Sequence, residues 1–272
     1  MLYEIKYTVN EDFFNELGKE QAWFLGMMSA DGHVRNGRQV CISQSGESGE
    51  KVINYIKKLI NFNGNIHYHD RSKQEWQDSY HIVFTSKNYF NKLNYYSICP
   101  NKTYNQEFPL NLPDNLLSAY LIGEFEGDGC AGVYTNKNGY SYLQMSFVGT
   151  KNFIEECSKR IPIPYSSVRE HSCSNVVWQI TWNGKKAINF YNWLWEGNEN
   201  LYKSKKYFIP KNYIETHVFE KDKYIEIRKQ VQALLDINKS VLTISKELDI
   251  PFQSIYKWIK NNKLYVRNTK IS

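Results

Sequence analysis

The chain has 272 residues, 42% of them apolar and 23% charged, enough for two domains or for one duplicated domain with an appendage. No apolar run approaches the roughly 18 residues that a membrane span requires, and the first residues lack a secretory signal layout. The five cysteines are widely spaced without a CxxC pair, which favours reduced thiols over disulfides or a zinc site. We expect a protein of the cytoplasm, an organelle matrix or a nucleoid, neither secreted nor membrane-bound.

The net charge of +6 is unevenly distributed along the chain. Residues 221–272 carry 11 Lys/Arg against 5 Asp/Glu, whereas residues 1–220 carry 23 of each. A balanced body with a basic C-terminal segment indicates a polyanionic partner for that segment. Basic C-termini are also common for solubility alone, so charge does not decide the point by itself.

The first predicted element is an apolar helix that ends at Asp31. Its layout returns at an offset of 97 residues, where Gly26, Asp31 and Gly32 recur as Gly123, Asp128 and Gly129. Two later pairs of segments match at an offset of 101 residues. These are the amphipathic stretches from Lys51 and Asn152, and the Lys-to-Pro segments that start at Lys102 and Lys203. Matched anchors in the same order favour an internal duplication.

Each half has the same predicted order of elements. The apolar helix is followed by two strands, with a hairpin signal at Asn36-Gly37 and again at Asn138-Gly139. An amphipathic helix, two more strands and a final helix complete each half. The prediction is an α+β fold, a pseudo-two-fold duplicated αββαββα unit with halves at residues 1–110 and 111–215.

The two apolar helices are expected to pack against each other at the pseudo-two-fold axis, where glycine permits a close backbone approach. Asp31 and Asp128 would then meet at the two helix C-termini. There both the helix dipole and mutual repulsion disfavour a carboxylate. A divalent cation would compensate, and hard oxygen ligands suit magnesium. The alternative is that each Asp-Gly merely forms a turn, which the equal placement in a duplicated unit disfavours.

At these residues the chain resembles the single-chain, two-motif LAGLIDADG homing endonucleases. The segments FLGMMSADG and LIGEFEGDG, residues 24–32 and 121–129, each cover the nine-residue motif. The resemblance extends over roughly residues 10–215. Ser29 stands where the family often has an acid, Glu124 stands where an apolar residue is common, and Glu126 keeps the other acid in the second motif only.

The resemblance implies a monomeric saddle of two four-stranded antiparallel sheets on double-stranded DNA with a long, specific target site. Both strands would be hydrolysed across the minor groove, leaving 3′ overhangs. It implies Asp31 and Asp128 as ligands of Mg²⁺, with Mn²⁺ as a substitute and Ca²⁺ binding without cleavage. Lys102 and Lys203, equivalent in the repeats, are candidates to assist the chemistry, and Lys206 rivals Lys203.

Base reading would fall to alternate side chains of the two hairpins, since Arg, Gln and Asn suit major-groove edges. Exposed strand surface without a DNA contact is the alternative for each of them. The candidates are Arg35, Arg38, Gln44, His67, His69 and Arg71 in the first half, and Tyr134, Asn136, Lys137, Gln144 and Arg169 in the second.

The sequence pattern becomes helical after Pro210. Residues 216–272 form a predicted all-α domain that resembles a helix-turn-helix. Ile244 and Leu248 would face inward on its first helix, and Ile255 and Ile259 on its second. The turn contains Asp249, where such motifs usually prefer glycine. The outward residues of the second helix are candidates for DNA contact: Gln253, Ser254, Tyr256, Lys257 and Lys260. A plain helical hairpin that packs on the body is the alternative.

The favoured function is therefore a site-specific DNA endonuclease, a metal-dependent phosphodiester hydrolase of the intron-homing type. A non-catalytic transcription regulator with a similar body and a C-terminal helix-turn-helix is one alternative. Regulators of that type have lost the motif acids that this chain keeps. An intron RNA maturase, with intron RNA as partner, is another. No phosphate-loop, HExxH or GxSxG motif competes with these assignments.

Overall fold

The computed structural model describes residues 7–35, 37–137, 139–172, 176–261 and 263–264. The chain forms two compact units, Met1–Lys211 and Asn212–Ser272. The first predicted half and all but residues 212–215 of the second lie within the first unit. Cys41, Cys99, Cys130 and Cys157 are free thiols. Asn36 and Asn138, the first residues of the two hairpin signals, lie outside the described residues, as does Cys173. Across the described residues, no helix has the length and apolar character of a membrane span.

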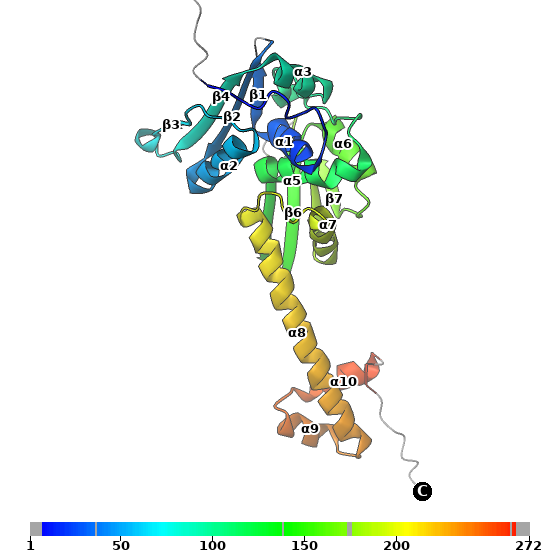
Figure 1. Ribbon diagram of the computed structural model, residues 1–272. Coiled ribbons are helices and arrows are strands. Elements are labelled where there is room, and N and C mark those ends of the chain that lie inside the picture. The colour runs from blue at the N-terminus through cyan, green and yellow to red at the C-terminus, as the bar shows by residue number, and fades with distance from the viewer. Residues whose placement is uncertain (1–6, 36, 138, 173–175, 262, 265–272) are drawn as a thin grey trace, which may run out of the picture. The chain divides into compact units, whose positions relative to one another are not determined.

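The first half contains one four-stranded antiparallel sheet, in the order β1-β2-β4-β3 (Figure 1). Its elements in chain order are α1 (Lys19–Ala30), β1 (Gly32–Arg35), β2 (Gln39–Ser45), α2 (Gly46–Leu59), β3 (His67–His69), the 3₁₀ turn η1 (Ser72–Gln74), β4 (Ser79–Thr85), α3 (Lys87–Tyr95) and α4 (Lys102–Asn105).

The second half repeats this arrangement with a sheet in the order β5-β6-β8-β7. Its elements are the 3₁₀ turn η2 (Asp114–Leu116), α5 (Leu117–Asp128), β5 (Gly129–Thr135), β6 (Ser141–Gly149), α6 (Lys151–Arg160), β7 (Ser167–Glu170), β8 (Trp178–Asn183) and α7 (Lys185–Trp195). The predicted duplicated αββαββα order and the α+β class are confirmed.

Helices α1 and α5 pack against each other without intervening side chains at two glycines. A Cβ atom added to Gly26 would lie 1.9 Å from Tyr120 O, and one added to Gly123 would lie 2.0 Å from Trp23 O. Each contact is therefore backbone against backbone, which only glycine allows. Since Trp23 and Tyr120 are themselves 97 positions apart, the two contacts are related by the pseudo-two-fold axis.

Burial alternates along the strands, as expected for sheets with one face on a core. On β2, Val40 and Ile42 are buried, and on β6, Leu143, Met145 and Phe147 are buried. The alternate positions belong to the opposite face of each sheet. This periodicity fixes which side chains are available to a ligand.

The second unit contains the C-terminal part of α8 (Lys205–Asp236), together with α9 (Val241–Glu247) and α10 (Phe252–Lys260). Helix α8 begins before Pro210, whereas the helical pattern was expected only after it. Pro210 therefore lies inside the helix, where it has no N–H to donate to the carbonyl of Lys206. At the helix start, the Ser204 hydroxyl accepts from Lys206 N at 3.0 Å.

A small separate core holds the second unit together. Its buried members are Val231, Leu235, Ile244, Ile255 and Leu264, while Leu248 and Ile259 pack against them partly buried. The four predicted inward residues therefore do face inward. Asp249 adopts a left-handed φ of 51°, a conformation that Asp tolerates better than most residues.

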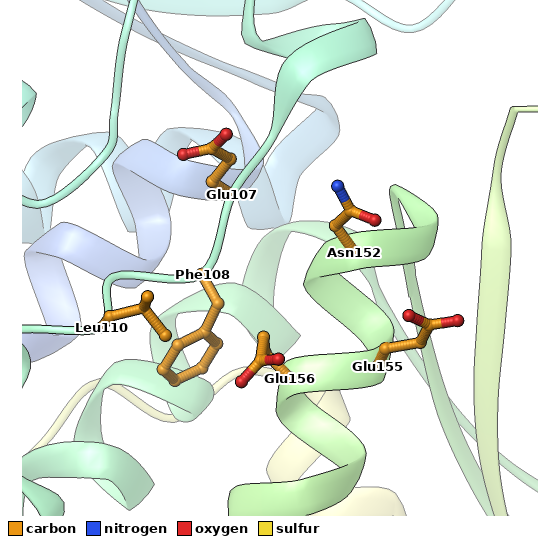
Figure 2. Close-up of a pocket in the computed structure, with 6 residues that line it drawn as sticks. All are labelled: Glu107, Phe108, Leu110, Asn152, Glu155 and Glu156. Atoms are coloured by element: carbon orange, nitrogen blue, oxygen red, sulfur yellow. The ribbon is translucent and has the colours of Figure 1, made fainter.

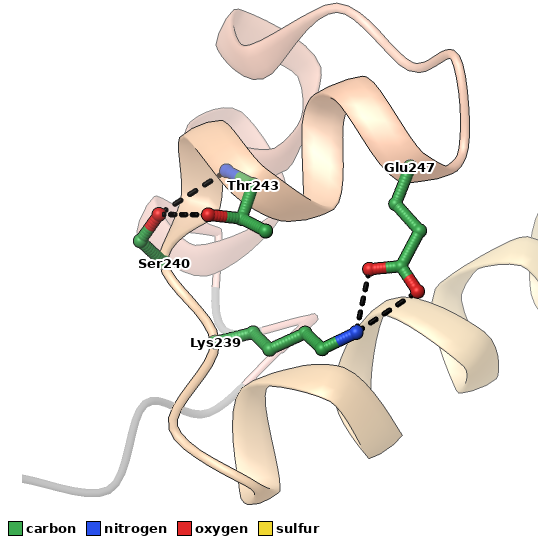
Figure 3. Close-up of polar contacts among 4 residues, drawn as sticks. All are labelled: Lys239, Ser240, Thr243 and Glu247. Carbon is green, nitrogen blue, oxygen red and sulfur yellow. Dashed lines mark hydrogen bonds and ion pairs between the residues drawn. The ribbon is translucent and has the colours of Figure 1, made fainter.

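Side-chain contacts fix the start of α9 (Figure 3). The Ser240 hydroxyl accepts from Thr243 N at 3.1 Å and so caps the helix. Lys239 pairs with Glu247 at 2.7 Å across the helix. These contacts order the short helix that precedes the turn at Asp249.

Candidate active site

The two motif acids lie at the C-terminal ends of the paired helices. Asp31 directly follows α1, and Asp128 is the last residue of α5. A Cβ atom added to Gly127 would lie 2.6 Å from Asp31 Oδ2. The Asp31 carboxylate therefore rests on the backbone beside Asp128, and the structure brings the two predicted ligands together.

Burial raises the pKa of both carboxyl groups. For Asp128 the pKa rises to about 6, with burial as the largest cause and the negative charge of Asp31 as the next. Burial also raises the pKa of Asp31, against a hydrogen bond from Gln44 and the charges of Lys102 and Lys206. Two poorly solvated acids that repel each other are stabilised by a cation between them.

Two lysines approach the same helix ends. Lys102 Nζ donates to Ser29 O at 2.6 Å and also to Ala30 O. Lys206 Nζ donates to three carbonyls at the end of α5: Phe125 O at 3.1 Å, Glu126 O at 2.7 Å and Gly127 O at 2.8 Å. Each ammonium thus binds main-chain carbonyls of the last helical turn, where the negative end of the helix dipole favours a cation.

Lys203 is not brought to this site. Its ammonium donates to Glu199 O and lies 5.1 Å from the ring centroid of Tyr207. The structural counterpart of Lys102 is therefore Lys206, in the first turn of α8. The offset of 101 residues paired Lys102 with the wrong lysine because the segments that lead to the two lysines differ in length.

Gln44 contacts Asp31 instead of lying on the exposed face. Its Nε2 donates to Asp31 Oδ2 at 2.5 Å. Gln44 shares its strand parity with the buried Val40 and Ile42, so its side chain points to the helices and not to the open face. The strand registers place Gly149 at the equivalent position of the second half, so Asp128 receives no matching contact from β6.

A buried polar cluster beside the carboxylates has no signal in the sequence. Gln106 Nε2 donates to Glu124 Oε1 at 2.8 Å and to Ser29 Oγ at 3.1 Å. Glu124 is 0% exposed, and burial raises its pKa to about 8. Glu124 is therefore largely neutral at pH 7, which explains how an acid occupies a position where an apolar residue is common.

The predicted base-reading residues fall into two groups. Strand register and exposure place one group on the open sheet faces: Arg35, His67 and His69 on the first sheet, and Tyr134, Gln144 and Arg169 on the second. The other group lies outside the strands: Arg38, Arg71, Asn136 and Lys137.

His33 and His81 lie on the same open face of the first sheet and were missed. The imidazole rings of His81 and His69 have centroids 4.6 Å apart. His33 lies two residues before Arg35 on the same strand, so the alternation of side chains would have placed it on the same face. The strand that carries His81 was predicted, but the sequence analysis did not assign which of its alternating residues lie on the open face of the sheet.

The carboxylate pair fits a hard divalent cation. Over the residues that the structure describes, no group of three or more His, Cys, Asp or Glu could hold a metal. Asp31 and Asp128 would therefore form a site with two protein carboxylates. Magnesium is often bound by one or two carboxylates, with water and substrate phosphates as its remaining ligands. Such a site is completed by the substrate.

A separate hollow lies beside α6 (Figure 2). It has a volume of about 300 Å³ and is lined by Glu107, Phe108, Leu110, Asn152, Glu155 and Glu156. None of these residues belongs to the carboxylate site. The hollow is therefore separate from that site.

Comparison with solved structures identifies the fold. A lysine-to-alanine mutant of I-SmaMI matches with a TM-score of 0.51 at 13% identity, over 76% of this chain and 93% of that chain. I-SmaMI is a meganuclease. The LAGLIDADG homing endonuclease I-LtrWI, bound to target DNA, gives a TM-score of 0.49 at 15% identity, over 76% and 91% of the two chains.

At this level of identity the first match establishes a shared fold and nothing finer. No protein-family model matches the sequence, and a search of curated proteins finds no relative. The chain thus has the α+β fold of the meganuclease I-SmaMI, with two four-stranded antiparallel sheets. Its two partly buried motif acids lie at the ends of the helices that join the halves.

Proposed function

We propose that this protein is a site-specific double-strand DNA endonuclease of the LAGLIDADG homing type that uses Mg²⁺. The observation that carries the proposal is the meeting of Asp31 and Asp128 at the ends of two helices packed backbone to backbone. A fold alone would not favour two carboxylates there. Because each half supplies one acid and one sheet, a single chain has the parts for both DNA strands.

Mg²⁺ held by Asp31 and Asp128 would polarise the scissile phosphates and lower the pKa of the attacking water. Around it, each residue has a definable role. Gln44 orients the Asp31 carboxylate through its hydrogen bond. Lys102 and Lys206 place positive charge beside the carboxylates, where it stabilises the charge that develops on the phosphate oxygens.

The open sheet faces would bind the duplex, and α10 would add a second contact. On α10 the side chains of Gln253, Tyr256, Lys257 and Lys260 are exposed, Ser254 is partly exposed, and Ile255 is buried in the core. Outward polar and basic residues on the second helix of such a pair suit the major groove and its phosphates. The second unit would thus lengthen the recognised site.

A cleavage selection tests the proposal directly. A randomised duplex library is incubated with the full chain and Mg²⁺, and the ends of the products are sequenced. We expect a long consensus site cut on both strands with 3′ overhangs, and the same site bound but uncut in Ca²⁺, whose looser coordination does not support hydrolysis. Binding of a consensus site without cleavage in Mg²⁺ or Mn²⁺ would instead identify a DNA-binding regulator.

A further inference from the structure

The candidate active site contains its own cations. Lys102 and Lys206 are partly buried, and their ammonium groups lie at the two helix ends that carry Asp31 and Asp128. The carbonyls that they bind belong to the residues directly before Asp31 and directly before Asp128. The pair of negative charges therefore faces a pair of positive charges.

The formal charges at the carboxylate pair consequently cancel. Glu124, one turn before Asp128, is largely neutral because burial raises its pKa to about 8. Glu126, two residues before Asp128, accepts a hydrogen bond at its Oε1 from Ser204 N, at 3.4 Å. A divalent cation that entered this site would meet two carboxylates and two ammonium groups in a poorly solvated space, where like charges repel strongly.

We infer that Lys102 and Lys206 are resident counter-ions that keep the carboxylate pair from binding a divalent cation until DNA phosphate enters the site. The inference rests on the proposed function, since it takes Asp31 and Asp128 as the metal ligands. A phosphate supplies negative charge to the ammonium groups and oxygen ligands to the metal. Metal and DNA must then strengthen each other's binding by the same factor.

Helix capping alone is the competing role for the two lysines. Both ammonium groups bind main-chain carbonyls, so loss of either could affect stability without affecting metal affinity. Lys→Gln substitutions separate the two roles, because glutamine keeps an N–H donor and loses the charge. Lys203→Gln is the matched control, since the Lys203 ammonium binds Glu199 O, away from the carboxylates.

The experiment measures Mn²⁺ binding to the full chain without DNA, by the EPR signal of free Mn²⁺ at low salt. The wild-type chain and Lys203→Gln should bind weakly. Lys102→Gln and Lys206→Gln should each bind at least about 10-fold more tightly, since each loses one repulsive charge near the metal. Adding Asp31→Asn to Lys206→Gln should abolish the gain. Equal affinity in all charge variants would overturn the inference.

Thermal unfolding provides a second readout, because the shift in Tm on adding Mn²⁺ is measured within each variant and can be read even from a destabilised one. A ligand that binds the folded state raises Tm according to its concentration relative to Kd. Mn²⁺ should therefore raise the Tm of Lys102→Gln and Lys206→Gln more than that of the wild-type chain, and equal shifts would again contradict the inference. Absence of metal binding in every variant, with absence of cleavage of any library member, would instead remove the proposed function.

Discussion

Asp31 and Asp128 occupy positions that stability alone disfavours. A carboxylate at a helix C-terminus opposes the helix dipole, and burial raises the pKa of both groups. Lys102 and Lys206 offset part of this cost through their charges and their hydrogen bonds to main-chain carbonyls. Residues held in an unfavourable environment within a cluster of charges are candidates for function on physical grounds.

Neutralising either acid should remove cleavage and leave the fold intact. We expect Asp31→Asn and Asp128→Asn each to reduce double-strand cleavage more than about 100-fold, because a metal ligand is lost. DNA affinity should be retained or slightly increased, since charge near the phosphates is removed. The free energy of unfolding should stay within about 1 kcal/mol of wild type. Plasmid cleavage, gel shifts and urea unfolding measure the three effects.

The control for this pair is Asp12→Asn, at an exposed position outside the site, which keeps the acceptor used by Asn15 Nδ2. It should cleave like the wild-type chain. Full cleavage by either site variant would contradict the assignment of that aspartate as a metal ligand. Loss of DNA binding together with cleavage would point to misfolding instead.

Glu124 predicts a pH dependence of stability. Its pKa is about 8 in the folded chain, above the ordinary value of 4.5, so the folded state holds a proton that the unfolded state releases. Stability is then greatest at low pH and falls as pH rises towards 8. Where Glu124 is fully protonated in the folded state and fully ionised in the unfolded state, the free energy of unfolding falls by about 1.4 kcal/mol per pH unit. Glu124→Gln should remove this contribution.

Urea unfolding at pH 6.5, 7.0 and 7.5 tests the dependence. This window lies above the pKa of about 6 for Asp128, so Glu124 dominates the change. Glutamine is the matched substitution because it keeps the oxygen that accepts from Gln106 Nε2 and cannot ionise. Equal slopes for both chains would show that Glu124 is already ionised in the folded state.

Helices α1 and α5 show what the packing of two elements requires of single positions. A Cβ atom on Gly26 would lie 1.9 Å from Tyr120 O and 2.7 Å from Glu124 N, so alanine cannot be accommodated without separating the helices. We expect Gly26→Ala to destabilise the chain by about 3 kcal/mol or more. Cleavage should fall as well, because the same contact sets the distance between the two acids.

Chemical denaturation with far-UV circular dichroism measures this effect. Glu20→Ala, at an exposed position in the first turn of the same helix, is the control. It should change the free energy of unfolding by less than about 1 kcal/mol, because the high helix propensity of alanine offsets part of the lost charge–dipole interaction. Gly123→Ala should behave like Gly26→Ala, since the two contacts are related by the pseudo-two-fold axis. A stable Gly26→Ala chain would mean that the helices do not touch at this point.

The elements were more predictable than the contacts between them. The periodicity of apolar residues and the internal duplication predicted the order of helices and strands, and the Asp-Gly helix ends predicted the meeting of the acids. The roles of Gln44 and Gln106 were not predictable, because a single glutamine carries no periodic signal. The repeat offset favoured Lys203, and the resemblance to the LAGLIDADG family suggested Lys206 as its rival. Only the three-dimensional path of the chain distinguishes the two lysines.

At the scale of the whole molecule, the charge is divided between two units with different cores. Residues 1–211 carry 23 Lys/Arg against 21 Asp/Glu, a net +2, whereas residues 212–272 carry 11 against 7, a net +4. The second unit has its own buried cluster around Val231, Ile244 and Ile255. The first unit retains both acids, both lysines and both sheets without it. Long-range attraction to DNA is therefore expected to come mainly from the C-terminal unit.

Removing residues 219–272 tests whether the C-terminal unit provides this attraction to DNA. A chain that ends at residue 218 should keep its fold and its metal-dependent chemistry, yet bind DNA more weakly and protect a shorter site. Because each neutralised phosphate adds about −0.9 to the slope of log affinity against log salt, the truncated chain should show a shallower slope.

In the full chain, Lys257→Gln with Lys260→Gln should remove up to about 1.8 of that slope, if both lysines contact phosphate. Binding isotherms between 50 and 200 mM salt, about the range where such slopes are resolved, with footprints at the lowest salt, measure both effects. Equal slopes and equal footprints for the full and truncated chains would show that the second unit stabilises the protein and does not contact DNA.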